Sequence, residues 1–159
     1  MDPAALWQAI RDRALDDDGA GGLFAGATPL VTEIYENNTP TGAQMPYIVY
    51  DLEYSIQMDG FRTALYLVQV RFGVFVKKDE IVSTEATTRA SQIIRRIRGN
   101  WQDQSYGTGP TYGFDRHILT LDGDWTAGMM QHIDSRALHE ETALHYVETY
   151  RVHVSQAGV

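Results

Sequence analysis

The stretch Thr63–Val76, TALYLVQVRFGVFV, decides the fold that we expect for this chain. Its side chains fall alternately on two faces of an extended backbone. One face carries Tyr66, Val68, Val70, Phe72, Val74 and Val76, and the other carries Leu65, Leu67, Gln69, Arg71, Gly73 and Phe75. A period of two over about twelve residues predicts a long strand with one face on a core and the other only partly covered.

The period changes directly after this strand. From Ile81 onward, apolar residues recur at helical spacing, which predicts an amphipathic helix over residues 79–98. The apolar stripe of this helix consists of Ala86, Ala90, Ile93, Ile94 and Ile97. A strand and a helix that each have one apolar side bury these sides against each other, so we expect this pair to form the core.

The residues before the central strand predict one helix and two further strands. The helix begins at Asp2-Pro3, an N-cap acid followed by a proline in the first turn. A short strand over Val31–Tyr35 follows, and a second strand opens at Pro46. Because Met58–Arg62 is predicted to be a hairpin connection, the second strand and the central strand should be antiparallel neighbours.

The residues after the second helix predict a loop and three more strands. Residues 99–115, GNWQDQSYGTGPTYGFD, have no period and are predicted to be a functional or mobile loop. Arg116–Leu121 is predicted to be a strand, and Gly128–Ser155 a long hairpin with its tip near His139–Glu141. The chain, residues 1–159, is therefore expected to be one α+β domain. Its antiparallel or mixed β-sheet should have about five to six strands, with two main helices packed on one face.

Composition and charge exclude several classes of protein. The net charge of −8 argues against a nucleic-acid binder that neutralises phosphates over a broad surface. No apolar run approaches the roughly 20 residues that span a bilayer, and the N-terminus has no signal-peptide pattern, so we expect no membrane association and synthesis in a cytoplasm. With no cysteine, the chain has neither disulfides nor thiolate metal ligands.

The motifs of common active sites are missing from the sequence. His145 and His153 share a strand face but lie about 26 Å apart, too far to bind one metal ion. The glycines near Phe24 do not fit a dinucleotide-binding pattern, since Phe24 occupies the third glycine position. We therefore expect no enzyme, no metal and no cofactor. Glu148 interrupts the apolar side of its strand, and its partner is left open.

Two adjoining features are candidates for an oligomer or partner interface. The first is a basic patch at the end of the second helix, and the second is the aromatic loop that follows it. The interface residues are Arg89, Arg95, Arg96, Arg98, Trp101, Tyr106 and Tyr112. Tryptophan and tyrosine beside arginine are typical of interface hot spots. In the alternative interpretation, the arginines complement the helix dipole and are solvated, and the aromatic rings fold back on the core.

The layout of the chain resembles the tail-completion proteins of long-tailed phages, the tail terminator or head–tail joining family. The resemblance covers most of the chain. It consists of the helix Pro3–Leu15, the strand ending in Ile34-Tyr35, the polar loop closing in Met45-Pro46-Tyr47-Ile48-Val49, the strand Leu65–Val76, the helix at 79–98 and a final strand over His145–Val154. The loop 99–115 and the segment Asp122–Gly128 depart from the family pattern.

The resemblance implies a structural virion protein without enzymatic activity. Such a protein forms a hexameric ring on the last ring of the tail tube protein, stops tube growth and joins the tail to the connector in the neck of the head. DNA passes through the centre without being bound specifically, which suits an acidic chain. The expected location is the virion, after synthesis in the host cytoplasm.

Three other functions remain open at this stage. An adaptor or stopper in the same neck is a close alternative to the terminator. A cone-shaped α+β domain that binds a small ligand or acts as an enzyme belongs to another class, and Glu148 with a nearby histidine or tyrosine would be its candidate site. The third is an oligomerisation domain without a tail partner.

Overall fold

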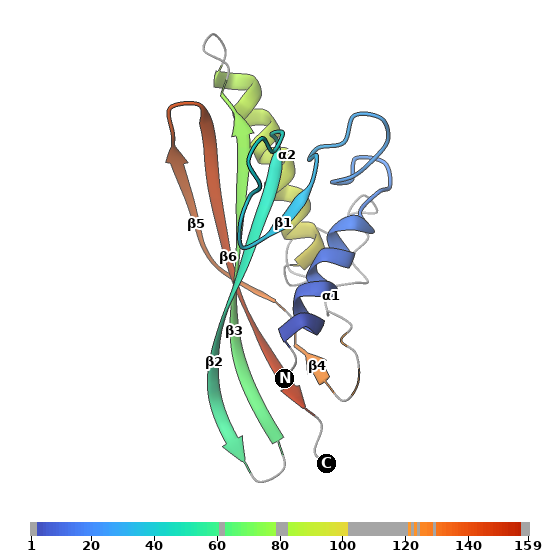
Figure 1. Ribbon diagram of the computed structural model, residues 1–159, viewed down its shortest axis with the longest axis vertical. Coiled ribbons are helices and arrows are strands. Elements are labelled where there is room, and N and C mark those ends of the chain that lie inside the picture. Colours follow the sequence, from blue (N-terminus) through green and yellow to red (C-terminus); the bar gives the residue numbers. More distant parts are fainter. Residues whose placement is uncertain are drawn as a thin grey trace.

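The computed structural model describes residues 3–60, 63–78, 83–101, 121, 123, 125–128 and 130–156. Two helices and a six-stranded mixed sheet confirm the expected α+β fold (Figure 1). The elements are α1 (Pro3–Leu15), β1 (Ile34–Glu36), β2 (Tyr47–Gly60), β3 (Thr63–Lys77), α2 (Ser83–Trp101), β4 (Trp125–Ala127), β5 (Gln131–His139) and β6 (Ala143–Gln156).

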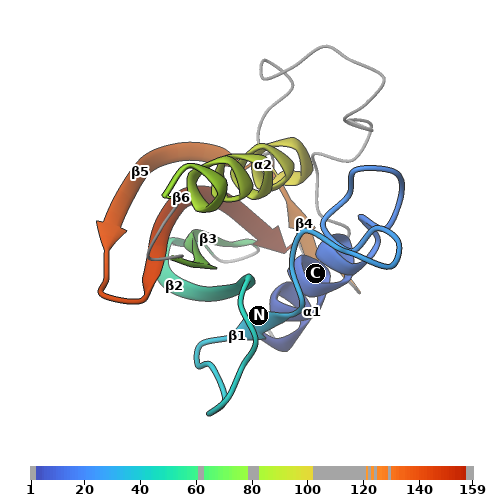
Figure 2. The same ribbon diagram turned by 90° about the horizontal axis from the view of Figure 1, so that it is seen from above.

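The sheet is built on antiparallel pairing around β3. The order of strands is β1-β2-β3-β6-β4. β4 and β5 both pair with the edge of β6 that faces away from β3, β4 near the end of β6 and β5 along its earlier residues. β2, β3, β6 and β5 form an antiparallel series in this order, while β1 runs parallel to β2. Figure 1 shows both helices on the same side of the sheet, and the view from above in Figure 2 shows that the sheet is strongly curled. One face of the sheet is therefore covered by helices.

The two faces of β3 follow the alternation that the sequence predicts. Val68, Val70, Phe72, Val74 and Val76 are buried against the helix layer. On α2 the stripe residues Ala86, Ala90, Ile93 and Ile97 are buried as well, while Ile94 is only half-buried. The predicted pairing of central strand and second helix is confirmed as the core.

Phe72 lies at the centre of this core. Its ring stacks on Trp101 at a centroid distance of 4.5 Å and meets Tyr150 edge-on at 5.8 Å. Tyr50 of β2 lies at 6.3 Å on the other side. Aromatic rings from α2, β2 and β6 thus converge on one residue of β3.

The bounds of α2 differ from the prediction. The helix begins at Ser83 and continues through Gly99 to Trp101, whereas the sequence predicts a helix over 79–98 followed by a loop. Trp101 comes four residues after Ile97 and extends the apolar stripe by one turn, so its burial on Phe72 keeps the last turn helical. Glycine at position 99 is a weak helix former, but packing of the indole outweighs that local preference.

The other differences lie at the ends of elements. The first strand is Ile34–Glu36 rather than Val31–Tyr35, and β2 continues through Met58 to Gly60, so the hairpin connection is shorter than predicted. The strand predicted over Arg116–Leu121 falls outside the described residues except for Leu121. The short strand β4 has no counterpart in the prediction, while the β5–β6 hairpin and its tip are confirmed.

We expect Trp101→Ala to lower the free energy of unfolding by about 3–5 kcal/mol, because it removes the largest fully buried side chain and leaves a cavity beside Phe72. Urea unfolding followed by far-UV circular dichroism measures the change. The control is Leu15→Ala on α1, where a side chain that is 39% exposed should matter by less than about 1 kcal/mol. Equal effects of the two changes would contradict the position of Trp101 in the core.

Candidate functional site

The predicted basic patch divides into exposed and internal arginines. Arg89 and Arg95 are exposed on α2. The Arg89 guanidinium donates to the backbone oxygen of Pro29 at 2.9 Å and to that of Leu30 at 3.4 Å. Arg89 thus holds the loop before β1 against the helix while remaining at the surface.

Arg96 lies on the inner side of α2 and binds a buried carboxylate. Its guanidinium forms a two-point ion pair with Asp17, whose side chain is only 6% exposed, with Nε at 3.0 Å from Oδ2. The same Oδ2 accepts hydrogen bonds from the Asn100 amide and from the backbone N–H of Leu23, each at 2.9 Å. Arg96 therefore fixes the loop after α1 to the end of α2.

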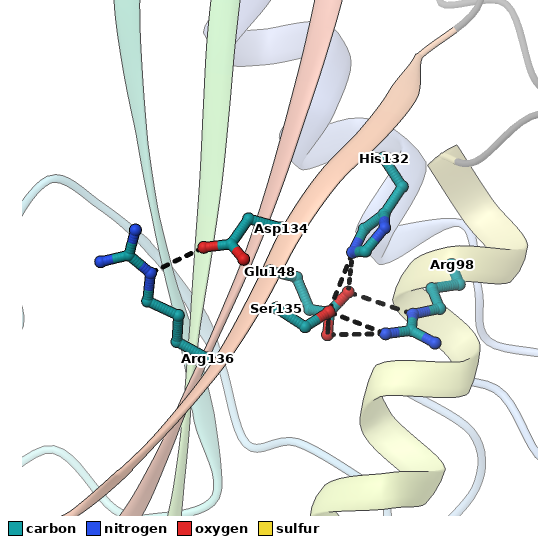
Figure 3. Close-up of polar contacts among 6 residues, drawn as sticks. All are labelled: Arg98, His132, Asp134, Ser135, Arg136 and Glu148. Carbon is teal, nitrogen blue, oxygen red and sulfur yellow. Dashed lines mark hydrogen bonds and ion pairs between the residues drawn. The ribbon is translucent and has the colours of Figure 1, made fainter.

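Arg98 binds the second buried carboxylate, Glu148 of β6 (Figure 3). Its Nε and Nη2 donate to the two carboxylate oxygens at 3.1 and 3.0 Å. The Glu148 side chain is 2% exposed and that of Arg98 24%. A two-point arginine–carboxylate pair is the strong form of this interaction, and it resolves the open question of how Glu148 is paired.

Two residues of β5 complete the cluster around Glu148. The Ser135 hydroxyl donates to Oε1 at 2.7 Å and accepts from Arg98 Nη2 at 2.9 Å. His132 Nε2 lies 3.0 Å from Oε2 of Glu148 and 2.9 Å from the Ser135 hydroxyl. We name Arg98, Glu148, Ser135 and His132 the carboxylate cluster. It joins α2, β6 and β5 through side chains alone.

The carboxylate cluster is internally satisfied. Both oxygens of Glu148 accept hydrogen bonds from the protein, so this carboxylate has no oxygen left without a donor. The neighbouring Tyr150 hydroxyl is buried and has no hydrogen-bond partner among the described residues. Burial, followed by the charge of Glu148, raises the pKa of Tyr150, so the phenol stays neutral at physiological pH. This arrangement is suited to holding three elements together.

Of the other sequence-predicted interface residues, the structure describes only Trp101, which does not share a surface with these arginines. The Trp101 indole is fully buried, so a partner could reach it only if it left the core. Tyr106 and Tyr112 lie outside the described residues. An interface role for Arg89 and Arg95 remains a prediction, while Arg96 and Arg98 bind carboxylates of the same chain.

The uncovered face of the sheet forms a broad groove of about 850 Å³. Its floor is made of side chains from β2, β3 and β6, and its walls are β5 and the loop after β1. The lining residues are Asn37, Asn38, Thr39, Val49, Asp51, Gln69, Arg71, Gly73, Phe75, Ile133, Asp134, Arg136, Leu138, His145, Val147 and Thr149. Ile133 and Leu138 of β5, which line the groove, are 49% and 47% exposed. We name this surface the open face.

A row of aromatic rings crosses the open face. His145 stacks on Phe75 at 4.0 Å, Phe75 stacks on Tyr47 at 5.0 Å, and Tyr47 meets Tyr35 edge-on at 5.7 Å. Gly73 makes room for the row, because a Cβ atom there would lie 3.0 Å from Nε2 of His145. The row connects four strands, β6, β3, β2 and β1, on the side of the sheet away from α1 and α2.

Charged groups on the open face occur as neighbouring pairs. Arg71 donates to Asp51 at 2.7 Å, which raises the pKa of the guanidinium, and it lies 3.9 Å from Glu53. Arg136 donates to Asp134 at 2.6 Å on the side of β5 away from the carboxylate cluster (Figure 3). The sequence predicts β5 as part of a hairpin but marks none of its residues as a candidate site. The irregular pairing between His132 and Asp134 breaks the alternation of side chains that would indicate its two faces.

Comparison of the sequence with models of known protein families finds no match, and comparison with curated proteins finds no relative. Within the described ranges, no group of three or more histidine, aspartate or glutamate side chains is arranged to hold a metal ion. The same part of the chain contains no helix that is long and apolar enough to cross a membrane. The function must therefore be argued from the geometry.

We expect Arg98→Met to lower the free energy of unfolding by about 3–5 kcal/mol, because it leaves the buried Glu148 carboxylate without its countercharge. The double variant Arg98→Met with Glu148→Met should recover much of this loss, since it buries no uncompensated charge. Gln92→Met is the control on the exposed side of the same helix and should stay within about 0.5 kcal/mol. Additive losses in the double variant would contradict a direct coupling of Arg98 with Glu148.

Proposed function

We propose that this chain is a structural assembly protein of the phage tail-completion type. In this role it forms a ring at the end of the tail tube, stops tube growth and joins the tail to the neck of the head. The observation that carries the proposal is the face of the sheet away from the two helices, which no other described helix or strand covers. Both helices pack on the opposite face, which leaves a groove of about 850 Å³ flanked by the exposed Ile133 and Leu138.

The open face has the character of a contact surface. Large exposed apolar side chains gathered beside polar ones are typical of protein–protein interaction sites. Val49, Phe75 and Val147 extend the apolar part across the floor of the groove, and the ion pairs of Asp51 and Asp134 border it. In the proposed role, an assembly protein covers this surface in its working state.

The order of the elements supports the same proposal. α1, β1, the loop into β2, β3, α2 and the final strand β6 follow one another in the chain, and these are the elements on which the resemblance to tail-completion proteins rests. The partners are further copies of the chain, the tail tube protein and the connector in the neck. The net charge of −8 disfavours adhesion of DNA that passes through the ring.

A ligand-binding or enzymatic domain is the second candidate. The volume of the groove lies within the range of roughly 300–1,000 Å³ that is usual for ligand pockets. Glu148 does have a nearby histidine and tyrosine, His132 and Tyr150, as this interpretation requires. However, Glu148 points to the helix side of β6, whereas Val147 and Thr149 line the groove. The titratable cluster and the groove are thus on opposite faces, which favours the assembly role.

Electron microscopy of particles from which the gene has been deleted tests the proposal, with the parent element taken to be a phage or prophage. We expect filled heads beside unattached tails of excessive or irregular length, because nothing stops tube growth or joins the parts. Restoring the gene on a plasmid should return normal particles. Normal tails attached to heads in the deletion would reject the role in tail completion, and a thermal-shift screen with small ligands would then test the second candidate.

A further inference from the structure

We infer that copies of this chain join edge to edge, with the outer edge of β5 in one copy pairing antiparallel with the exposed part of β2 in the next. This inference rests on the proposed ring and names the surface that builds it. The contact is heterologous, because β5 and β2 lie at opposite edges of one sheet. Repetition of a heterologous contact closes into a ring when the rotation between copies permits it.

The first edge is the outer side of β5. β5 pairs with β6 on its inner side, and no described strand pairs with its outer side. From Ser135 to His139 the side chains are exposed. A strand of this kind offers a row of backbone N–H and C=O groups to another strand.

The second edge is the part of β2 beyond β1. The short strand β1 pairs only with Ile48, Val49 and Tyr50 of β2. From Asp51 to Gly60, β2 has β3 on one side and no described strand on the other. β1 itself is less suitable as an edge, since Arg11 donates to the backbone oxygen of Ile34 at 2.6 Å.

The directions of the strands suit this pairing. β2, β3, β6 and β5 form an antiparallel series, so β5 runs opposite to β2 within one copy. If the next copy is placed by rotation about an axis along the strands, its β2 lies antiparallel to β5 of the first copy. Ring formation therefore continues the antiparallel pattern without reversing any strand.

The side chains at the two edges are complementary in charge. Arg136 on β5 is 73% exposed and Glu53 on β2 is 65% exposed, and both lie on the open face. Within the part of the chain that the structure describes, Glu53 contacts Arg71 at the long distance of 3.9 Å. A register that sets Arg136 beside Glu53 of the next copy forms an opposite-charge cross-strand pair. This register staggers the two copies along the strands, as curved sheets require when they close.

In the same register, side chains that point to the helix side of the two strands also lie opposite one another. Ala137 of β5 comes beside Leu52 of the next copy, and Ser135 comes beside Tyr54. The irregular pairing between His132 and Asp134 limits the usable edge to the residues after it. The carboxylate cluster holds this segment in place, since Ser135 and His132 bind Glu148 and Arg98 from the edge strand. The edge is therefore already ordered in the single copy.

Cysteine cross-linking tests the contact, because the chain has no cysteine of its own. Within one copy, positions 53 and 136 are separated by the width of β3 and β6, roughly 14 Å or more, which a disulfide cannot span. The purified single variants Glu53→Cys and Arg136→Cys are oxidised separately and as a mixture. A double variant that carries both cysteines in one chain is oxidised as well, and all samples are at high concentration and physiological ionic strength. The assay is repeated with a short bismaleimide cross-linker, which joins the two cysteines even if the register between the strands is shifted slightly.

We expect cross-linked dimers only in the mixture of the two single variants and a ladder of larger oligomers with the double variant. Dimers of Arg136→Cys alone would show β5 pairing with itself and would overturn the proposal. No cross-linking in any combination would overturn it as well. Ser55→Cys with His139→Cys serves as a matched control for random collision, and it should cross-link less.

Charge reversal gives an independent readout in sedimentation velocity. Arg136→Glu or Glu53→Arg alone should weaken self-association about tenfold, and both changes together should restore it, since the pair is re-formed with its charges exchanged. Far-UV circular dichroism checks that each variant is folded. Equal association of all variants would overturn the proposed contact.

The two proposals can fail separately. If cross-links are absent while deletion of the gene gives unattached, overlong tails, the role in tail completion stands and this contact is wrong. If cross-links form while particles without the gene are normal, the contact stands and the role in tail completion is wrong.

Discussion

The burial of the inner face of β3 against α2 is the contact on which the rest of the structure depends. β3 is paired along nearly its whole length with β2 on one side and β6 on the other. Phe72 at its centre touches aromatic rings from α2 and β6 and lies near Tyr50 of β2. Because these rings exclude water from the core, the ion pairs behind them are strengthened by the lower dielectric of their surroundings.

The arginines of α2 show how charge is used in this fold. Arg96 and Arg98 reach inward to carboxylates that are almost fully buried, Asp17 in the loop after α1 and Glu148 on β6. Each pair joins segments that are distant in the sequence. The arginine patch that the sequence predicts as a contact surface therefore partly serves to form ion pairs within the chain, while Arg89 and Arg95 stay at the surface.

The difference between the two faces of the sheet connects the fold with function. The helix side is packed and its buried carboxylates are paired. The open face keeps Ile133, Leu138 and a row of stacked rings next to solvent. Both helices lie on one face of the sheet, and the edges at β5 and at the part of β2 beyond β1 have no outer neighbour among the described strands. The proposals for ring formation and tail completion rest on these features.

The sequence by itself determined the class of fold, the order of the two helices and of β1, β2, β3, β5 and β6, both faces of β3 and the tip of the β5–β6 hairpin. These features depend on periodicity and turn residues, which act over a few neighbouring positions. Only the tertiary structure decided that α2 extends to Trp101, that Arg98 binds Glu148 and that β5 presents its outer edge. Each of these depends on a contact between distant residues: the burial of the indole on Phe72, an ion pair across 50 positions, and a strand order that leaves β5 without an outer neighbour in the described part of the chain. Local pattern cannot supply such contacts, because it carries no information about which segments meet.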